Sequence, residues 1–217
     1  MNKIRPLVLA SVLLGVSACQ SGEIEVSTAQ PGARGDITLA SFNEDGSLNQ
    51  PENWREWVYV GTPLTPDELN NGAANFPEFH NVYIDPASYR HYETTGDFPE
   101  GTQIVKELVL VRGHDGDEGG GQDADNGSTL EVSGRGYFMG EFAGLEMAIK
   151  DSARFPDEPG NWAYFSWGHQ PQPYAATATA FDAAACNACH EGSAEDDFVF
   201  TQFYPVLRAA KASKAAQ

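Results

Sequence analysis

The sequence contains few cysteines and little basic charge, and each shortage limits what the chain can be. Three cysteines are too few for the disulfide framework that stabilises small secreted domains. The 13 lysine and arginine residues stand against 31 acidic residues, which gives a formal net charge of −18. Such a chain is repelled by nucleic acid and by anionic lipid, whereas basic protein partners are attracted to it. High solubility is the alternative reason for this composition.

The sequence also lacks an apolar run long enough to span a membrane as a permanent helix. The apolar stretch over residues 7–16 is shorter than the roughly 20 residues that a transmembrane helix needs. It follows the basic residues Lys3 and Arg5, and this order is typical of an export signal. The stretch ends in Val16-Ser17-Ala18-Cys19, which resembles the lipobox of bacterial lipoproteins, where the cysteine is acylated and becomes the N-terminus.

The start of the chain therefore predicts a lipoprotein signal peptide over residues 1–19, with lipidation of Cys19. An ordinary signal peptide cleaved nearby is the alternative. We expect an exported protein that is lipid-anchored on the periplasmic side of the bacterial outer or inner membrane. Residues 20–50 are polar, so we predict a flexible tether there. No repeat or second domain is apparent, and residues 51–210 are long enough for one buried core.

Short apolar and β-branched runs, bounded by turn residues, predict about five strands in this domain. Leu145, Met147 and Ile149 are spaced by two, which favours a strand over a helix there. A helical turn is predicted over residues 65–69, and a loop rich in glycine and acid over 113–127. Strands are predicted over residues 57–61, 80–85, 102–111, 129–139 and 162–168, and one more over 141–151, where a helix is the alternative. Helices are predicted over 86–94 and 194–212, the second bent or broken at Pro205. This pattern predicts an α+β fold, an antiparallel β-sheet with flanking helices.

The strongest chemical signal is the run Cys186-Asn187-Ala188-Cys189-His190. Two thiols separated by two residues can add to the two vinyl groups of one porphyrin, and the adjacent histidine then lies beside the iron as an axial ligand. We predict one covalent haem c near the C-terminus, attached at Cys186 and Cys189 with His190 on the iron. A zinc site would need more ligands, with only His169 close, and a redox C-x-x-C would normally open a helix in a βαβ unit.

The position of the motif bears on the sixth iron ligand, because no Met or His follows it. Any sixth ligand must come from upstream, although Met residues are more often core packing and His residues are more often surface groups. An open sixth position would mean ligand binding or chemistry rather than simple electron transfer. The upstream candidates are His80, His91, His114, His169, Met139 and Met147.

Several further blocks resemble the cytochrome P-460 family, which includes cytochrome c′-beta. Together they cover about residues 53 to 208 in the family's order. They are Phe79-His80-Asn81-Val82-Tyr83, Phe98-Pro99-Glu100-Gly101-Thr102, Val105-Lys106-Glu107-Leu108, Lys150-Asp151-Ser152-Ala153-Arg154-Phe155, Gly160-Asn161-Trp162-Ala163-Tyr164-Phe165, the haem motif, and Phe198-Val199-Phe200-Thr201-Gln202-Phe203-Tyr204.

The resemblance implies a sheet-rich α+β fold, usually homodimeric, with a five-coordinate haem c. In the P-460 branch a lysine is also bonded to the porphyrin edge and hydroxylamine is oxidised. In the c′-beta branch that bond is missing and the haem binds nitric oxide or similar gases. We expect oxidation of hydroxylamine or a related nitrogen compound, with electrons leaving to a soluble redox partner. The alternatives are a non-catalytic gas-binding protein and an electron-transfer cytochrome.

The resemblance makes Lys106 the candidate for the cross-linking lysine. On a strand, Lys106 shares a face with Ile104 and Leu108, where a charged amine costs free energy unless it is paired or loses its charge. A covalent bond through its nitrogen would remove that cost. The alternatives are a lysine that reaches solvent at a sheet edge, or one paired with Glu107 or Glu146.

Three other residues are candidates for the distal side of the haem. Glu146 lies among apolar neighbours and could relay protons from bound hydroxylamine, with solvent exposure as the alternative. Phe76 and Phe79 could wall the distal pocket, as aromatic residues do in this family, with core packing as the alternative. The acidic loop over residues 114–126 departs from the family. Calcium binding there is conceivable, but the spacing fits no EF-hand and favours a solvated insert.

Overall fold

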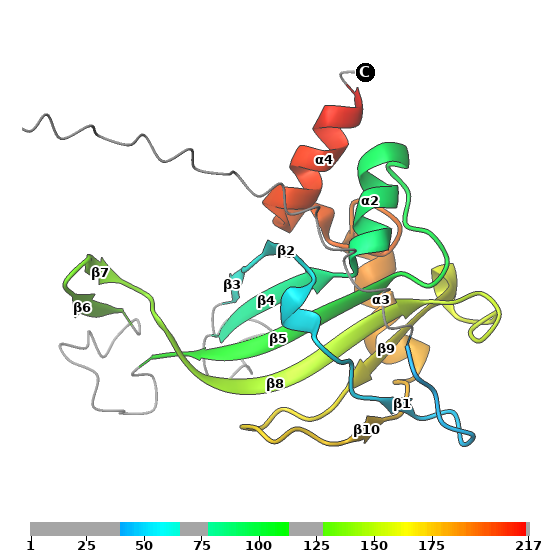
Figure 1. Cartoon of the computed structure of the whole chain (residues 1–217), viewed down its shortest axis with the longest axis horizontal. Coiled ribbons are helices and arrows are strands. Elements are labelled where there is room, and N and C mark those ends of the chain that lie inside the picture. Colours follow the sequence, from blue (N-terminus) through cyan, green and yellow to red (C-terminus); the bar gives the residue numbers. More distant parts are fainter. Residues whose placement is uncertain (1–39, 66–77, 113–127, 216–217) are drawn as a thin grey trace, which may run out of the picture. The chain divides into compact units, whose positions relative to one another are not determined.

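Six strands form one antiparallel sheet in the order β2-β4-β5-β8-β9, with β3 also paired to β4 (Figure 1). The computed structural model describes residues 40–65, 78–112 and 128–215. The strands of this sheet are β2 (Val58–Gly61), β3 (Leu64–Thr65), β4 (Glu78–Ile84), β5 (Gln103–Val111), β8 (Met139–Lys150) and β9 (Trp162–Ser166). Two small sheets pair β1 (Leu48–Asn49) with β10 (Thr177–Ala178), and β6 (Thr129–Glu131) with β7 (Gly134–Gly136).

Three α-helices accompany the sheet: α2 (Pro86–Thr95), α3 (Ala183–Ser193) and α4 (Pro205–Ala215). Asp85 caps the start of α2, since its side chain accepts hydrogen bonds from the backbone N–H groups of Ala87 and Ser88. Gly96, with a φ of 78°, caps the end of the helix. Three single turns of 3-10 helix complete the described chain: η1 (Trp54–Glu56), η2 (Pro159–Asn161) and η3 (Thr201–Phe203). None of the helices within the described ranges combines the length and apolar character needed to cross a membrane.

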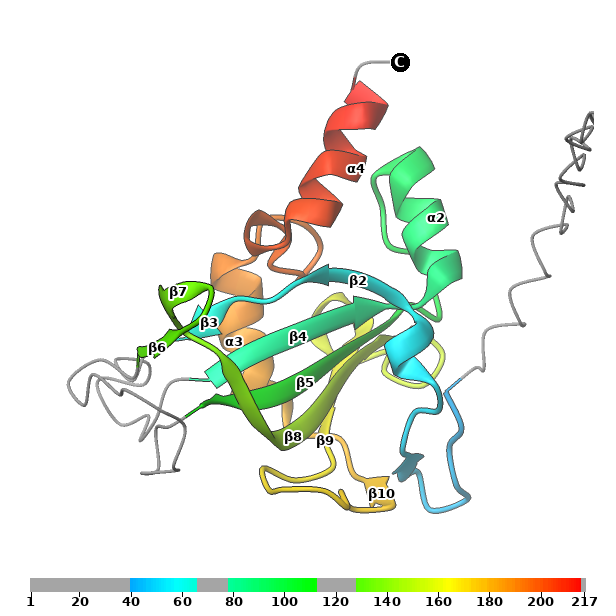
Figure 2. The ribbon, with the colours of Figure 1, turned by 60° about the vertical axis from the view of Figure 1, so that its left-hand side comes forward.

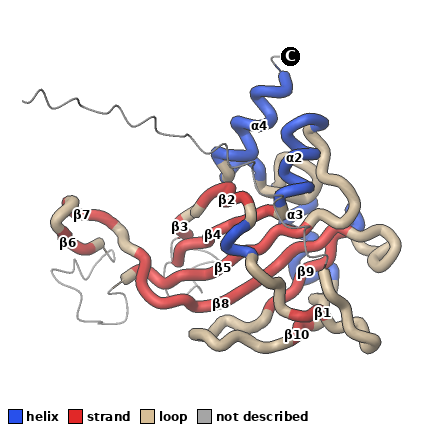
Figure 3. The backbone as a smooth tube through the Cα atoms, viewed as in Figure 1, coloured by secondary structure: helices blue, strands red, loops and turns tan. Residues whose placement is uncertain are grey.

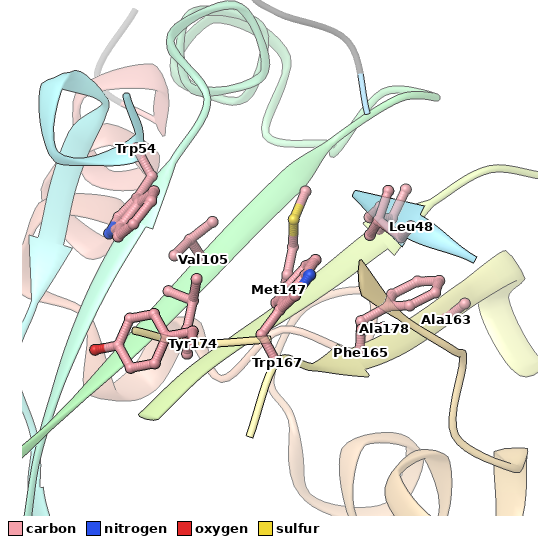
Figure 4. Packing of buried hydrophobic residues seen from close by; sticks show 11 residues of the cluster. Leu48, Trp54, Val105, Met147, Ala163, Phe165, Trp167, Tyr174 and Ala178 are labelled. Atoms are coloured by element: carbon pink, nitrogen blue, oxygen red, sulfur yellow. The ribbon is translucent and has the colours of Figure 1, made fainter. Parts of the chain in front are cut away.

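The sheet is covered differently on its two faces, because successive side chains of a strand point to opposite sides. The helices α2 and α4 lie on one face of the sheet (Figures 2 and 3). The core on this face contains Val82 and Ile104 of the sheet, Tyr92 of α2 and Leu207 of α4. The other face carries Val105, Met147 and Phe165, which pack against Leu48 of β1 and Ala178 of β10 (Figure 4). The sheet therefore separates two apolar cores.

The structure confirms the predicted α+β fold with an antiparallel sheet and flanking helices. The predicted strands over residues 57–61, 80–85, 102–111, 141–151 and 162–168 correspond to β2, β4, β5, β8 and β9, and the helix over 86–94 corresponds to α2. Residue 65 lies in β3, whereas residues 66–69 of the predicted turn fall outside the described residues. Three other predictions also fall outside the described residues: the signal peptide, which includes Cys19; the pocket residue Phe76; and the acidic loop, which includes His114.

Two predicted elements are wrong. Residues 129–139 do not form one strand, because a turn before Gly134, whose φ is 113°, folds them into the β6–β7 hairpin. Residues 194–204 contain no α-helix, only the single 3-10 turn η3, because Asp197 and Phe198 have φ values of 41° and 62°, which a right-handed helix does not contain. Only the part from Pro205 onward is the helix α4.

The described part of the predicted tether, residues 40–50, is folded rather than flexible. Leu48 is 1% exposed in the core of the sheet's second face, and it pairs with Ala178 in the small β1–β10 sheet. The partly buried Phe42 packs on the same core, with its ring 6.0 Å from that of Phe165. The folded unit therefore begins before residue 50, and the rest of the predicted tether lies outside the described residues.

Candidate haem-binding site

Helix α3 carries the haem motif and presents its three reactive side chains together. Cys186, Cys189 and His190 stand at positions i, i+3 and i+4, which are neighbours on a helix surface. Asn187 points the other way and is 2% exposed, and its Nδ2 donates to Oε2 of Glu158 and to the carbonyl of Trp162, both at 3.3 Å. Asn187 thus holds α3 against β9, and Cys186, Cys189 and His190 take no part in these two hydrogen bonds.

The three residues line a cavity of about 830 Å³ between α3, the sheet and the segment around η3. This volume lies within the roughly 300–1,000 Å³ that is usual for cofactor and small-molecule sites. Cys186 and Cys189 are not joined in a disulfide. Lys106 and Glu146 of the sheet border the same cavity. Aromatic and aliphatic side chains form most of the remaining wall: Leu64, Val82, Ile104, Ala148, Tyr164, Phe181, Phe200, Phe203 and Tyr204.

The His190 ring is held in one orientation. Its Nδ1 donates to the carbonyl oxygen of Phe198 at 2.7 Å, and the ring lies between those of Tyr164 and Phe200, each with a centroid 4.6 Å away. Because a carbonyl can only accept, Nδ1 carries the proton and the lone pair of Nε2 is left for a metal. Burial lowers the pKa of His190, the Phe198 carbonyl opposes this in part, and the charge of Lys106 lowers it further. The neutral imidazole is the form that binds metals.

The Phe198 carbonyl that holds His190 comes from a strained turn. Asp197 and Phe198 both have positive φ, a conformation that costs on the order of 1–3 kcal/mol for each residue and clusters at functional sites. The turn is fixed by Lys150, whose Nζ donates to Oδ2 of Asp197 at 2.6 Å and to the carbonyl of Phe98 at 3.1 Å. The strain is therefore offset by the bond from Lys150 at the end of β8.

Lys106 and Glu146 meet on the sheet wall of the cavity. They stand directly opposite each other in the β5–β8 ladder, and their Nζ and Oε2 atoms are 2.5 Å apart. Each side chain is one third exposed. This corresponds to the alternative in which Lys106 pairs with Glu146, whereas a bond between Lys106 and the porphyrin stays a prediction. Burial raises the pKa of the Cys186 thiol, and the charge of Glu146 raises it further.

The other sequence candidates lie in different places. His80 borders the cavity, but Phe79 lies next to it on the strand and points to the opposite face, because side chains alternate along β4. Phe79 is therefore not a wall of this cavity. Met147 reaches the cavity edge, but its side chain packs into the core of the second face (Figure 4). His91 is exposed on α2, and Met139 is 47% exposed at the start of β8.

The residues present fit a haem attached through two thioethers. Two thiols and a neutral imidazole project from one helix into an apolar cavity of suitable size. The Tyr164 hydroxyl on its wall is buried and has no hydrogen-bond partner in the described part of the chain. A buried donor without a partner costs about 1–3 kcal/mol, so a polar atom of a bound group is expected to satisfy it.

Sequence reasoning on single motifs missed several residues that shape this site. Tyr164, Phe198 and Phe200 were noticed only as parts of family blocks, and nothing in the sequence singled out Asn187 within the motif. Their roles depend on contacts between segments that are far apart along the chain.

Comparison with protein-family profiles gives a match to the family described as Cytochrome P460 over residues 51–201, which includes the haem motif and the strands of the cavity wall. A search of curated proteins gave no match. The profile spans well over half of the chain and confirms the resemblance drawn from the blocks. The chain belongs to the cytochrome P460 family, and it is a haem protein.

Proposed function

We propose that the protein carries one haem c bonded to Cys186 and Cys189, with His190 on the iron, and that it oxidises hydroxylamine or a related small nitrogen compound. One observation carries the proposal: a single cavity brings the haem motif of α3 together with Lys106 and Glu146 of the sheet. When bound, the haem supplies the redox chemistry, while the protein controls access, orientation and proton movement.

An open iron position is supported by the absence of a suitable sixth ligand among the described residues of the cavity. His80 is the other histidine that borders it, and its Nε2 is already 2.9 Å from Oε1 of Glu78. The Met147 side chain is committed to the second core. A six-coordinate electron carrier is therefore the less favoured alternative.

Each residue of the sheet wall has a distinct part in the proposed chemistry. Glu146 accepts a proton at its carboxylate from hydroxylamine held in the cavity, and Lys106, directly opposite on β5, holds its side-chain nitrogen beside that carboxylate. The apolar walls limit the entry of water, which strengthens electrostatic interactions inside. The electrons leave to a soluble redox partner.

A second function is favoured by the pairing of Lys106 itself. If its amine remains an ammonium ion bound to Glu146, the porphyrin cross-link is missing, as in the c′-beta branch, and the protein binds nitric oxide or similar gases. Mass spectrometry of haem-bearing peptides separates the two cases. A haem peptide that includes Lys106 supports the enzyme, whereas a haem peptide with Cys186 and Cys189 alone supports the gas-binding protein.

Hydroxylamine consumption by periplasmically matured protein, with a one-electron acceptor such as ferricyanide, tests the enzymatic proposal. We expect E146Q to lower turnover by on the order of 10²-fold. The matched control is E141Q, on the exposed part of the same strand, which is expected to retain wild-type turnover. If the protein were colourless and the thiols of Cys186 and Cys189 could both be alkylated, the haem c assignment would be overturned. Coloured protein that leaves hydroxylamine unchanged would overturn the reaction.

Three further parts of the proposal concern the location of the protein, its oligomeric state and its partners. We propose a lipid anchor through Cys19 on the periplasmic side of the outer or inner membrane, a homodimer, and no contact with nucleic acid. The acidic composition supports the last point. Metabolic labelling with a fatty acid, compared between wild type and C19A, tests the anchor.

A further inference from the structure

A carboxylate joins two histidines at the edge of the haem cavity. Oε1 of Glu78 lies 2.9 Å from Nε2 of His80, and Oε2 of the same side chain lies 3.0 Å from Nε2 of His169. Both carboxylate oxygens are thus engaged by imidazole nitrogens. The Oγ1 atom of Thr65 lies 3.3 Å from Nε2 of His80 and helps to hold that ring. None of these side chains has a part in the chemistry proposed above.

The three side chains lead from the cavity to the surface. His80 borders the cavity and its side chain is 16% exposed, Glu78 is 14% exposed, and His169 is 46% exposed. Glu78 and His80 are two residues apart on β4, so they share a face of the sheet. His169 follows β9 and reaches Glu78 from another segment of the chain, 91 residues away.

The sheet leaves space for this arrangement at Gly144 of β8. A Cβ atom there would lie 2.9 Å from Cδ1 of Leu108, 3.0 Å from the carbonyl oxygen of Gly168 and 3.3 Å from Cδ2 of His169. A side chain at this position would therefore displace the segment that carries His169. Because Gly144 has no side chain, the His169 ring can reach Glu78 across the two strands β5 and β8.

The charge state of Glu78 suits proton transfer. Burial alone would raise its pKa, but the hydrogen bond and charge of His80, and the interactions with His169, bring the pKa below its ordinary value. The carboxylate is therefore ionised at neutral pH and can accept a hydrogen bond or a proton from an imidazole. A metal site is the alternative use of such residues, but the described residues contain no group of three His, Cys, Asp or Glu side chains placed to hold a metal ion.

We propose that His80, Glu78 and His169 form a proton relay between the haem cavity and solvent. The proposal rests on the proposed function, because oxidation of hydroxylamine releases protons as well as electrons. The electrons pass to the one-electron acceptor, and each proton leaves separately. When His80 takes up a proton at Nδ1, the proton on its Nε2 passes to Oε1 of Glu78. Rotation of the protonated carboxyl group turns this proton toward Nε2 of His169, in the tautomer that holds its own proton on Nδ1, and His169 then releases a proton to water.

Other titratable groups also face the cavity, so a test must separate their effects from those of the relay. Lys106 and Glu146 are paired with each other and stand on β5 and β8, whereas the relay begins on β4. The remaining titratable side chains of the wall, within the described chain, are Tyr164, Cys186, Cys189, His190 and Tyr204. None of these is changed by a substitution at positions 78, 80 or 169.

The test compares H80Q, E78Q and H169Q in the haem-loaded protein. Glutamine keeps hydrogen-bonding atoms but does not titrate near neutral pH. We expect H80Q to slow hydroxylamine turnover by on the order of 10²-fold and to change its solvent deuterium isotope effect. H169Q lies at the exposed end and is expected to recover turnover when imidazole is added. The control is H91Q, an exposed histidine of α2 that does not border the cavity.

A second readout does not depend on turnover. The pH dependence of the haem midpoint potential, measured without hydroxylamine, reports proton uptake that accompanies reduction. We expect a steeper dependence between pH 5 and 8 in the wild type than in H80Q or E78Q, and no change in H91Q.

The two readouts separate failure of the relay from failure of the reaction. If the wild type oxidises hydroxylamine and all three variants match it in rate, isotope effect and potential, the relay is wrong and the reaction stands. If the wild type does not oxidise hydroxylamine but the potential changes as expected, the reaction is wrong and proton coupling through His80 stands. H80Q or E78Q, at the less exposed positions, could fail to bind haem, and H169Q then still tests the relay. A wild-type rate in H169Q contradicts a proton exit through His169.

Discussion

The ring of Phe198 occupies the space that a side chain of Gly160 would need. Gly160 has a φ of 63°, and its closeness to Phe198 joins the loop before β9 to the turn that follows α3. The carbonyl oxygen of Phe198 in turn accepts the Nδ1 proton of His190. A glycine that is 30 residues away along the sequence therefore controls the orientation of the expected iron ligand.

We expect G160A to destabilise the protein and to disturb the haem ligand. The added methyl group must push the Phe198 ring away, and the positive φ is unfavourable for alanine, so we expect a loss of about 1–3 kcal/mol. Thermal unfolding gives the stability, and the optical spectrum reports His190 ligation.

The control for this substitution is G101A. Gly101 has a φ of 82°, but no atom lies within 4 Å of the place where its Cβ would stand. It therefore carries the conformational cost of alanine without a steric clash. Equal stabilities and identical spectra for G160A and G101A would contradict the coupling between Gly160 and His190.

Asn187 provides a second prediction within the haem motif. Removal of its amide in N187A breaks the two hydrogen bonds that fasten α3 to η2 and β9, and it leaves the carbonyl of Trp162 without that donor. We expect a loss of about 1–3 kcal/mol in the free energy of unfolding and less complete haem attachment. Denaturant unfolding and the ratio of haem to protein absorbance measure the two effects. A188S, at the neighbouring exposed position, should match the wild type in both.

The sequence predicted those features that are encoded locally. Alternation in the run Leu145, Met147, Ile149 indicated β8, and the pattern over residues 86–94 indicated α2. The haem motif likewise needs no tertiary information, because the two attachment thiols and the expected iron ligand lie within five consecutive residues of one helix. These patterns sufficed for the sheet, for one helix and for the core of the site.

Features that depend on distant contacts could not be predicted. Leu48 is a single apolar residue among polar neighbours, so its burial against Ala178 left no periodic signal. The positive φ values at Asp197 and Phe198 break what otherwise resembles a helical run. The sequence gives His80 no role beyond that of a candidate iron ligand, because its contact with Glu78, and the contact of Glu78 with His169, form only in the folded chain.

Asp196 predicts how stability depends on pH. Its carboxylate accepts hydrogen bonds from Tyr92, Thr201 and Lys211, at 3.0, 2.7 and 2.6 Å, and so joins α2, η3 and α4. Although burial raises the pKa of Asp196, these bonds bring it below its ordinary value of 3.8. A lowered carboxylate pKa gives stability that is present above the unfolded-state pKa and is lost as pH falls through the folded-state pKa.

We therefore expect the free energy of unfolding of the wild type to fall below about pH 4, and D196N to lose part of that dependence. Urea unfolding at a series of pH values between 3 and 7 measures it. D97N is the control, since Asp97 is an exposed aspartate at the end of α2. If D196N and the wild type lose stability in parallel as the pH falls, the assignment to Asp196 is wrong.

The adjacent residues Lys106 and Glu107 provide the last prediction, because they point to opposite faces of β5. Glu107 is 1% exposed on the second face, where Nε of Arg55 donates to its Oε2 at 3.2 Å and the guanidinium lies against the rings of Trp54 and Phe142. On the cavity side, the Lys106–Glu146 pair is one third exposed, and pairs so exposed contribute only about 0–1 kcal/mol.

We expect E107Q to lower the free energy of unfolding by about 1–3 kcal/mol while the spectrum of the bound haem is unchanged. E146Q should change stability by less than about 1 kcal/mol while it alters the chemistry of the cavity. Denaturant unfolding and hydroxylamine turnover, measured on both variants, distinguish the two. If E107Q reduced turnover as strongly as E146Q at full haem occupancy, the sheet would not separate a structural face from a chemical one.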